Sequence, residues 1–201
     1  MLQLTEKLKA GEALSPADIN LATTDLISED VDSNGKADFL TAFAEKGESA
    51  EEIASFAREF IDLAVKPDLD SASLGKPIID VCGTGGDKLD LFNVSTTSVF
   101  LLAAAGVAVV KHGNRGITSK SGGADALEAL GIRIDLPSEQ FGECVASVGA
   151  GFLFAPMYHP AFKAVVPVRK ALAEKGQRTV FNLLGPLLNP VDPDYQLIGI
   201  F

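Results

Sequence analysis

Two glycine-rich segments carry the residues whose types and spacing are best suited to chemistry, and the first is GTGGD, residues 83–87. Glycines lack a Cβ atom, so this backbone can adopt positive φ and present bare N–H groups to a ligand at close range. Asn93 and Ser95 follow where the next helix is expected to begin, so hydroxyls and the positive end of a helix dipole converge there. The arrangement favours a phosphate or diphosphate, although GTGGD taken alone also fits a simple tight turn.

The second segment, KHGNRGITSKSGG, covers residues 111–123 and combines cations, hydroxyl residues and glycines. Its positively charged side chains are Lys111, Arg115 and Lys120. No Asp or Glu occurs between residues 91 and 124, so the local charge attracts anions. Lys120 alone fits a solvated lysine, and His112 alone fits a hydrogen-bonded core histidine. Together the residues predict a bound polyanion.

Two better-known phosphate motifs do not match these segments. The dinucleotide-binding fingerprint needs a glycine where Lys88 stands, and the Walker loop needs a glycine where Ser119 stands. Both are therefore rejected.

The elements that position these segments alternate between apolar runs and helical patterns, which is typical of βαβ units with a mainly parallel sheet. Strands are expected at 77–82, 107–110, 132–136, 151–155 and 195–201. Helices are expected at 94–105, 124–130 and 138–148. In such sheets ligands bind beyond the carboxyl ends of the strands, where the loops 83–87, 111–123 and 155–161 would lie.

The first third of the chain reads as helical. Ser15 before Pro16 and Ser49 before an apolar stripe are expected helix N-caps. Residues 1–72 hold 16 acidic and 6 basic side chains, whereas residues 73–201 hold 11 of each. Residues 66–77 have the composition of a linker. The sequence thus predicts a small helical domain, 1–72, followed by an α/β domain, 73–201.

Composition excludes several classes of protein. With 47% hydrophobic residues the chain can bury a core. The longest apolar run, 99–110, is too short to span a membrane, and the first residues do not resemble a signal peptide, so a cytoplasmic location is expected. Cys82 and Cys144 are too few for a disulfide framework and are expected to pack as small hydrophobes.

Five motifs taken in order resemble the anthranilate phosphoribosyltransferase family: GTGGD, NVST, KHGNR, SKSGGAD and RTVFNLLGPLLNP. The resemblance runs from about residue 5 to residue 201. It implies a nucleoside phosphorylase-like fold, with a small helical domain and a larger α/β domain. It also implies Mg²⁺-dependent transfer of a phosphoribosyl group from phosphoribosyl diphosphate to anthranilate in tryptophan biosynthesis, by a homodimer formed through the helical domain.

The resemblance implies residue roles motif by motif. The residues expected to bind phosphoribosyl diphosphate are Gly83, Gly86, Asp87, Leu91, Asn93, Val94, Ser95, Thr96, Lys111, His112, Gly113, Asn114, Arg115, Gly116, Ile117, Thr118, Ser119 and Gly123. Those expected to contact anthranilate are Gly83, His112, Asn114, His159 and Arg169. A guanidinium suits the substrate carboxylate because it offers a bidentate fork.

Three of these residues carry the expected catalytic and metal roles. Ser95 matches a Mg²⁺ ligand. Lys111 is expected to neutralise the leaving diphosphate, and Asp87 to orient its loop or a metal-bound water.

The sequence departs from the family pattern at three places. Leu91 and Gly123 stand where hydroxyl residues are usual, so two hydroxyl contacts are missing, and either the affinity is weaker or backbone and water substitute for them. The family also continues beyond residue 201 and supplies an Asp-Glu pair that binds Mg²⁺. We therefore expect this chain to be a fragment or truncated form.

Two other functions stay open at this point. A pyrimidine nucleoside phosphorylase shares the architecture and a phosphate-binding loop, but KHGNR and FNLLGPLLNP favour the transferase. A non-catalytic nucleotide- or nucleic-acid-binding relative is disfavoured because the acidic first third repels phosphate backbones. The sequence thus predicts small-molecule substrates, with neither nucleic acid nor membrane as partner.

Overall fold

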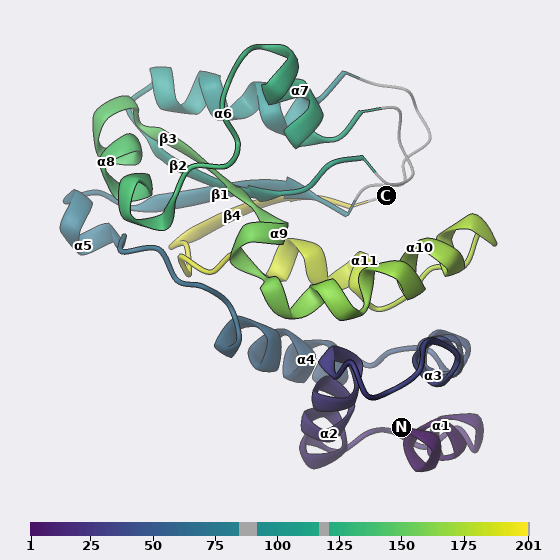
Figure 1. The fold of residues 1–201 in the computed structure, drawn as a ribbon. Coiled ribbons are helices and arrows are strands. Elements are labelled where there is room, and N and C mark those ends of the chain that lie inside the picture. Colours follow the sequence, from purple (N-terminus) through teal and green to yellow (C-terminus); the bar gives the residue numbers. More distant parts are fainter. Residues whose placement is uncertain (85–91, 117–120, 201) are drawn as a thin grey trace. The chain divides into compact units, whose positions relative to one another are not determined.

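The computed structural model describes residues 1–84, 92–116 and 121–200 (Figure 1). Its contacts divide the chain into two compact units. The first unit joins Met1–Ala64 to His159–Leu188, and the second joins Val65–Tyr158 to Asn189–Phe201. The sequence predicted one boundary near residue 72, so the division differs from it chiefly by placing His159–Leu188 with the N-terminal helices.

The first unit is helical. Its elements are α1 (Leu2–Lys9), α2 (Pro16–Ile27), α3 (Ser33–Lys46), α4 (Ala50–Asp62), η1 (Pro160–Ala164), α10 (Val166–Glu174), α11 (Phe181–Leu184) and η2 (Gly185–Leu187). The predicted caps Ser15 and Ser49 are confirmed, since each hydroxyl accepts a hydrogen bond from the third residue of its helix in a capping box. These local signals explain why both helices begin where the sequence placed them.

A cluster of phenyl rings explains why distant segments form one unit. Phe60, on the predicted apolar stripe of α4, lies 4.8 Å from Phe162 and 5.5 Å from Phe181 between ring centroids. Phe162 and Phe181 meet edge to face at 5.4 Å. Buried aromatic side chains dominate the packing energy of small cores. The apolar stripe of α4 therefore packs against residues about 100 positions away in the chain.

Glu52 provides a test of the helical unit. Its carboxylate is buried and accepts 2.8 Å hydrogen bonds from the Leu14 N–H, the Ser49 N–H and the Lys46 ammonium. Burial opposes ionisation, but these donors hold the pKa of Glu52 below its ordinary value of 4.5. We expect Glu52→Gln to lower the free energy of unfolding by about 1–3 kcal/mol at pH 7.

The pH dependence of this loss has a definite sign. A carboxyl group with a depressed pKa stabilises the fold above its unfolded pKa, and that contribution is lost as the pH falls through the folded pKa. Denaturant unfolding measures the free energy of unfolding of wild type and of Glu52→Gln. The difference between these two free energies should be constant above about pH 5 and should become smaller below it. A difference that stays constant down to pH 3 would contradict the assignment.

The second unit contains a parallel sheet with strand order β3-β2-β1-β4 among the described residues. Its elements are α5 (Ser71–Leu74), β1 (Ile78–Gly83), α6 (Val94–Ala104), β2 (Ala108–Gly113), α7 (Gly123–Ala129), α8 (Ser138–Val148), β3 (Ala150–Phe154), α9 (Ala155–Tyr158) and β4 (Tyr195–Gly199). The expected α/β class and mainly parallel sheet are confirmed. In the described ranges, no helix reaches the length and apolarity that a membrane crossing requires.

Alternation along β2 determines which side chains reach which layer. Val109 packs with Val99 of α6, whereas Ala108 and Val110 pack in the cluster that contains α8. Figure 1 shows α6 and α7 together on one face of the sheet. Since side chains along a strand alternate between faces, Lys111 shares the face of Val109 and points towards α6.

Three local predictions need correction. Residues 132–136 form no strand, because Ile134 inserts into the cluster beside α7 while its charged neighbours stay exposed. Residues 155–161 are not an open loop: α9 starts directly after β3, and Pro160 starts η1. The expected linker, 66–77, contains the short helix α5, capped by the side chain of Asp70.

Candidate functional site

The carboxyl ends of β1 and β2 meet at one edge of the sheet, as predicted for parallel strands. Gly83 ends β1 and Gly113 ends β2. A Cβ atom at Gly113 would lie 2.9 Å from the ring of Phe152, so a larger residue there would have to displace that ring. The two segments singled out in the sequence therefore leave the sheet beside each other.

Lys111 is a buried cation at this edge, with 5% of its surface exposed. Its Nζ donates to the Val81 carbonyl at 2.6 Å and to the Ser95 hydroxyl at 3.1 Å. Burial lowers the pKa of the ammonium, an effect that the nearby Asp80 partly offsets. No carboxylate of the described residues forms an ion pair with Lys111. A buried charge without a close ion pair is costly, and an anionic ligand would supply one.

The N-terminus of α6 lies over this ammonium. Ser95 touches Lys111 directly, and the neighbouring Thr96 is 3% exposed. The Thr96 hydroxyl has no hydrogen-bond partner among the described residues. Buried hydroxyls are normally satisfied, so this one is available to a ligand. With the helix dipole, the three groups make a compact site for an anion.

Asn93 and Gly123 connect the two segments at this point. The Asn93 amide donates to the Ser121 hydroxyl at 3.2 Å. A Cβ atom at Gly123 would lie 3.0 Å from the Thr96 hydroxyl and 3.3 Å from Cε of Lys111. Gly123 was noted as a departure from the family pattern, and its lack of a side chain lets α7 begin directly against these two residues.

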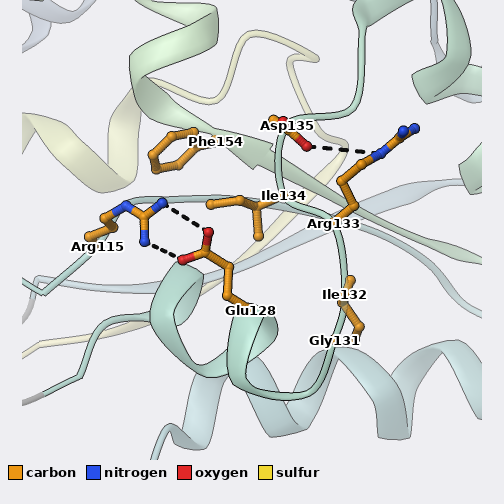
Figure 2. A pocket seen from close by; sticks show the side chains of 8 residues that line it. All are labelled: Arg115, Glu128, Gly131, Ile132, Arg133, Ile134, Asp135 and Phe154. Carbon is orange, nitrogen blue, oxygen red and sulfur yellow. Dashed lines mark hydrogen bonds and ion pairs between the residues drawn. The ribbon is translucent and has the colours of Figure 1, made fainter.

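Arg115 does not point to this anion site in the structure. Its guanidinium forms two hydrogen bonds with Glu128, one of them 2.9 Å long, and lies 5.4 Å from the ring centroid of Phe154. Figure 2 shows Arg115 and Glu128 directed at each other in a pocket of about 570 Å³ that also contains Arg133 and Asp135. A solvent-screened ion pair of this kind is weak, so phosphate can compete for Arg115.

His112 of β2 and Asp80 of β1 lie next to each other in the sheet. The backbone N–H of His112 donates to the Asp80 carboxylate at 3.2 Å, and both side chains are buried. Burial raises the pKa of Asp80, while hydrogen bonds from Asn189 and His112 oppose that rise. Asn189 also donates to the Val110 carbonyl at 2.8 Å, so part of the FNLLGPLLNP motif braces the sheet. Asp80 was not among the predicted site residues, although a charged residue inside an apolar strand was its signal.

Other predicted residues are placed as follows. Val94 begins α6, and Asn114 is exposed directly after β2, with its side-chain oxygen accepting from the Arg115 N–H. Gly116 donates its N–H to Asp125 at 2.8 Å. The residues that lie outside the described part of the chain are Gly86, Asp87, Leu91, Ile117, Thr118 and Ser119.

Arg169 and His159 belong to the first unit. The Arg169 guanidinium stacks 4.7 Å from the ring centroid of Phe181, and burial lowers its pKa to about 10. It forms no ion pair with a described residue and stays protonated at neutral pH, as binding of a carboxylate requires. His159 is buried, bonds to the Leu188 carbonyl at 2.8 Å and stacks 5.1 Å from Phe162. Its expected role beside the aromatic substrate stays a prediction.

The described residues do not form a resident Mg²⁺ site. Ser95 is the expected ligand, but its oxygen already accepts a hydrogen bond from the Lys111 ammonium. Within residues 1–84, 92–116 and 121–200, no group of three His, Cys, Asp or Glu side chains is arranged to hold a metal. One hydroxyl beside a cation is a poor site for a hard divalent ion.

Two family models cover nearly the whole chain. The helical bundle domain of a glycosyl transferase family matches residues 2–64, and the a/b domain of that family matches residues 75–201. The chain therefore belongs to this glycosyl transferase family.

Its relatives are anthranilate phosphoribosyltransferases, which confirms the resemblance of the motifs. That of Persephonella marina is 54% identical over 156 residues, covering 78% of this chain and 44% of the relative. That of Ignicoccus hospitalis is 46% identical over 197 residues, covering 98% and 56%. The chain thus spans about half the length of the curated relatives it matches.

Solved structures agree with the fold. The Thermus thermophilus anthranilate phosphoribosyltransferase has a TM-score of 0.84 at 42% identity, covering 98% of this chain and 58% of that one. The Saccharomyces cerevisiae enzyme, in complex with PRPP (phosphoribosyl diphosphate) and Mg, has a TM-score of 0.86 at 30% identity, covering 100% and 58%.

Proposed function

We propose that the second unit binds phosphoribosyl diphosphate and that the protein transfers its phosphoribosyl group to anthranilate. The observation that carries the proposal is Lys111, a buried ammonium under the N-terminus of α6 that forms no close ion pair with any described residue. The Thr96 hydroxyl, unpartnered among the described residues, supplies a further donor. The relatives' names and the PRPP and Mg complex of the yeast enzyme support the choice of this anion.

The chemistry requires mainly charge stabilisation and orientation. The anthranilate nitrogen forms a bond to the anomeric carbon, the bond from that carbon to the diphosphate oxygen breaks, and the amine loses a proton to solvent. Lys111 and the donors of α6 oppose the charge that develops on the diphosphate. Holding both substrates in line lowers the entropic part of the barrier. A Mg²⁺ ion bound to the diphosphate would neutralise part of the negative charge of that group.

Arg169 is proposed to bind the anthranilate carboxylate. Replacing a guanidinium that forms a bidentate pair removes about 1.5–3 kcal/mol of binding, so Arg169→Ala should weaken anthranilate binding by roughly 10- to 150-fold. Binding of phosphoribosyl diphosphate should change less than threefold on the same scale. Calorimetric titrations of each substrate measure both effects, and Lys170→Ala, at the exposed neighbouring position, is the control. Equal losses for the two substrates would contradict the role.

The reaction is tested by following the fluorescence of anthranilate. Consumption of anthranilate that needs both phosphoribosyl diphosphate and Mg²⁺ would support the transferase. Arsenate-dependent cleavage of thymidine would instead support the pyrimidine nucleoside phosphorylase alternative. Absence of both activities in a folded chain would contradict catalysis by these residues alone.

The same proposal extends to the biological setting. We place the reaction in tryptophan biosynthesis, in the cytoplasm, and propose a homodimer formed through the N-terminal helices.

A further inference from the structure

Two short segments of the second glycine-rich loop lie directly against each other. Residues 114–116 leave β2, and residues 121–124 lead into α7. The Ala124 N–H donates to the Asn114 carbonyl at 3.3 Å. A Cβ atom at Gly122 would lie 2.3 Å from the Gly116 nitrogen, so the two backbones are in contact. The base of the loop is therefore closed.

One side chain holds this closure. A single oxygen of Asp125, Oδ2, accepts hydrogen bonds from the Gly116 N–H at 2.8 Å and from the Gly122 N–H at 2.7 Å. Its other oxygen lies 3.6 Å from the Arg115 guanidinium. These donors lower the pKa of Asp125, so the carboxylate is charged at neutral pH. The two glycine amides thus serve an internal anion and are not directed at a ligand.

The contact between these two backbone segments positions the residues that lie against the anion site. Ser121 receives the hydrogen bond from Asn93, and Gly123 lies against Thr96 and Lys111. Both positions adjoin Gly122, whose N–H is held by Asp125. The Asp125 carboxylate is therefore connected to the anion site through the backbone N–H groups of Gly116 and Gly122, with no flexible side chain in between.

We infer that Asp125 is a positioning residue that ties Gly116 to Gly122 and so aligns α7 and its preceding turn with the anion site. Its role comes from accepting two hydrogen bonds, because its negative charge by itself would repel a diphosphate. The effect on ligand affinity rests on the proposed function, whereas the tie itself does not.

The variants Asp125→Ala and Asp125→Asn separate these contributions. Asparagine keeps an acceptor oxygen for both amides, while alanine removes it. Titration with inorganic diphosphate and Mg²⁺ should show about tenfold or greater weakening for Asp125→Ala, because small displacements of binding groups are costly. Asp125→Asn should stay within about threefold of wild type. Asp135→Ala, which removes an exposed carboxylate from the pocket that Arg115 lines, is the matched control.

Equal weakening by the alanine and asparagine variants would overturn the inference, since it would assign the effect to charge. Unchanged affinity of a folded Asp125→Ala chain would also overturn it. Amide hydrogen exchange of Gly116 and Gly122, measured by NMR without ligand, tests the tie independently. Faster exchange at both amides in Asp125→Ala than in Asp125→Asn is expected, and equal exchange would refute the tie. If wild type failed to bind diphosphate while the exchange result held, the proposed function alone would be contradicted.

Discussion

Replacement of Lys111 by methionine is expected to weaken binding of phosphoribosyl diphosphate by roughly 100-fold, or about 2.7 kcal/mol. The ammonium is buried, so water screens its interaction with a bound anion only weakly. It forms no close ion pair with any described residue, and Asp80 offsets the effect of burial only in part, so a bound anion is strongly attracted to the charge. Methionine keeps most of the chain length and removes the charge and its donors.

The same change should alter folding stability much less than binding. Removing a buried unpaired charge stabilises the fold, whereas leaving the Val81 carbonyl without its donor destabilises it. These effects oppose each other, so we expect the free energy of unfolding to change by less than about 2 kcal/mol. Lys66→Met, at an exposed lysine of the same unit, is the control for both measurements. A folded Lys111→Met chain with wild-type affinity would remove Lys111 from the site.

Substitution of Gly122 by alanine is the second change with a large expected effect. The new Cβ would lie 2.3 Å from the Gly116 nitrogen, 2.6 Å from the Arg115 carbonyl carbon and 2.8 Å from the Asn114 oxygen. All three are backbone atoms, which cannot rotate away as a side chain would. We expect a loss of about 1–3 kcal/mol in the free energy of unfolding and a loss of diphosphate affinity comparable to that of Asp125→Ala.

Gly35→Ala is the matched control because its Cβ would lie 3.6 Å from the Asp32 carboxylate, at ordinary contact distance. In a helix such a change stabilises by roughly 0.5–1 kcal/mol. Denaturant unfolding and diphosphate titration of both variants provide the comparison. Equal stability of the Gly122→Ala and Gly35→Ala chains would show that the loop base is not closed as described.

Elements with local signals could be predicted from the sequence. Ser15 and Ser49 cap their helices because the hydroxyl and the third helical residue satisfy each other, and that pattern is visible within four residues. Helix α8 was predicted at 138–148 and lies at Ser138–Val148, between Pro137 and the left-handed Gly149. Such features depend on neighbours in the chain.

Features set by distant contacts could not be predicted in this way. The packing of Phe162 and Phe181 against Phe60 depends on residues about 100 positions apart. The run at 132–136 alternates like a strand, but Ile134 packs beside α7 and the run pairs with no strand. Periodicity shows that a side chain is buried without showing what covers it.

The residues of the candidate site could be predicted from the sequence, whereas the carboxylates that position them could not. Lys111, Ser95 and Thr96 lie in segments whose composition is unusual for a surface loop. Asp125 and Glu128 lie in an ordinary helical pattern, and only the fold shows that one ties two glycine amides and the other pairs with Arg115. Carboxylates that act through the backbone leave little trace in a single sequence.

The central claim is that the sheet edge and the N-terminus of α6 form a diphosphate site around Lys111. It is tested most directly by calorimetric titration of the 201-residue chain with phosphoribosyl diphosphate, with and without Mg²⁺, after circular dichroism has shown that the chain is folded. We predict saturable one-site binding that is tighter with Mg²⁺ and lost in Lys111→Met. A folded wild-type chain that releases no heat of binding would contradict the account.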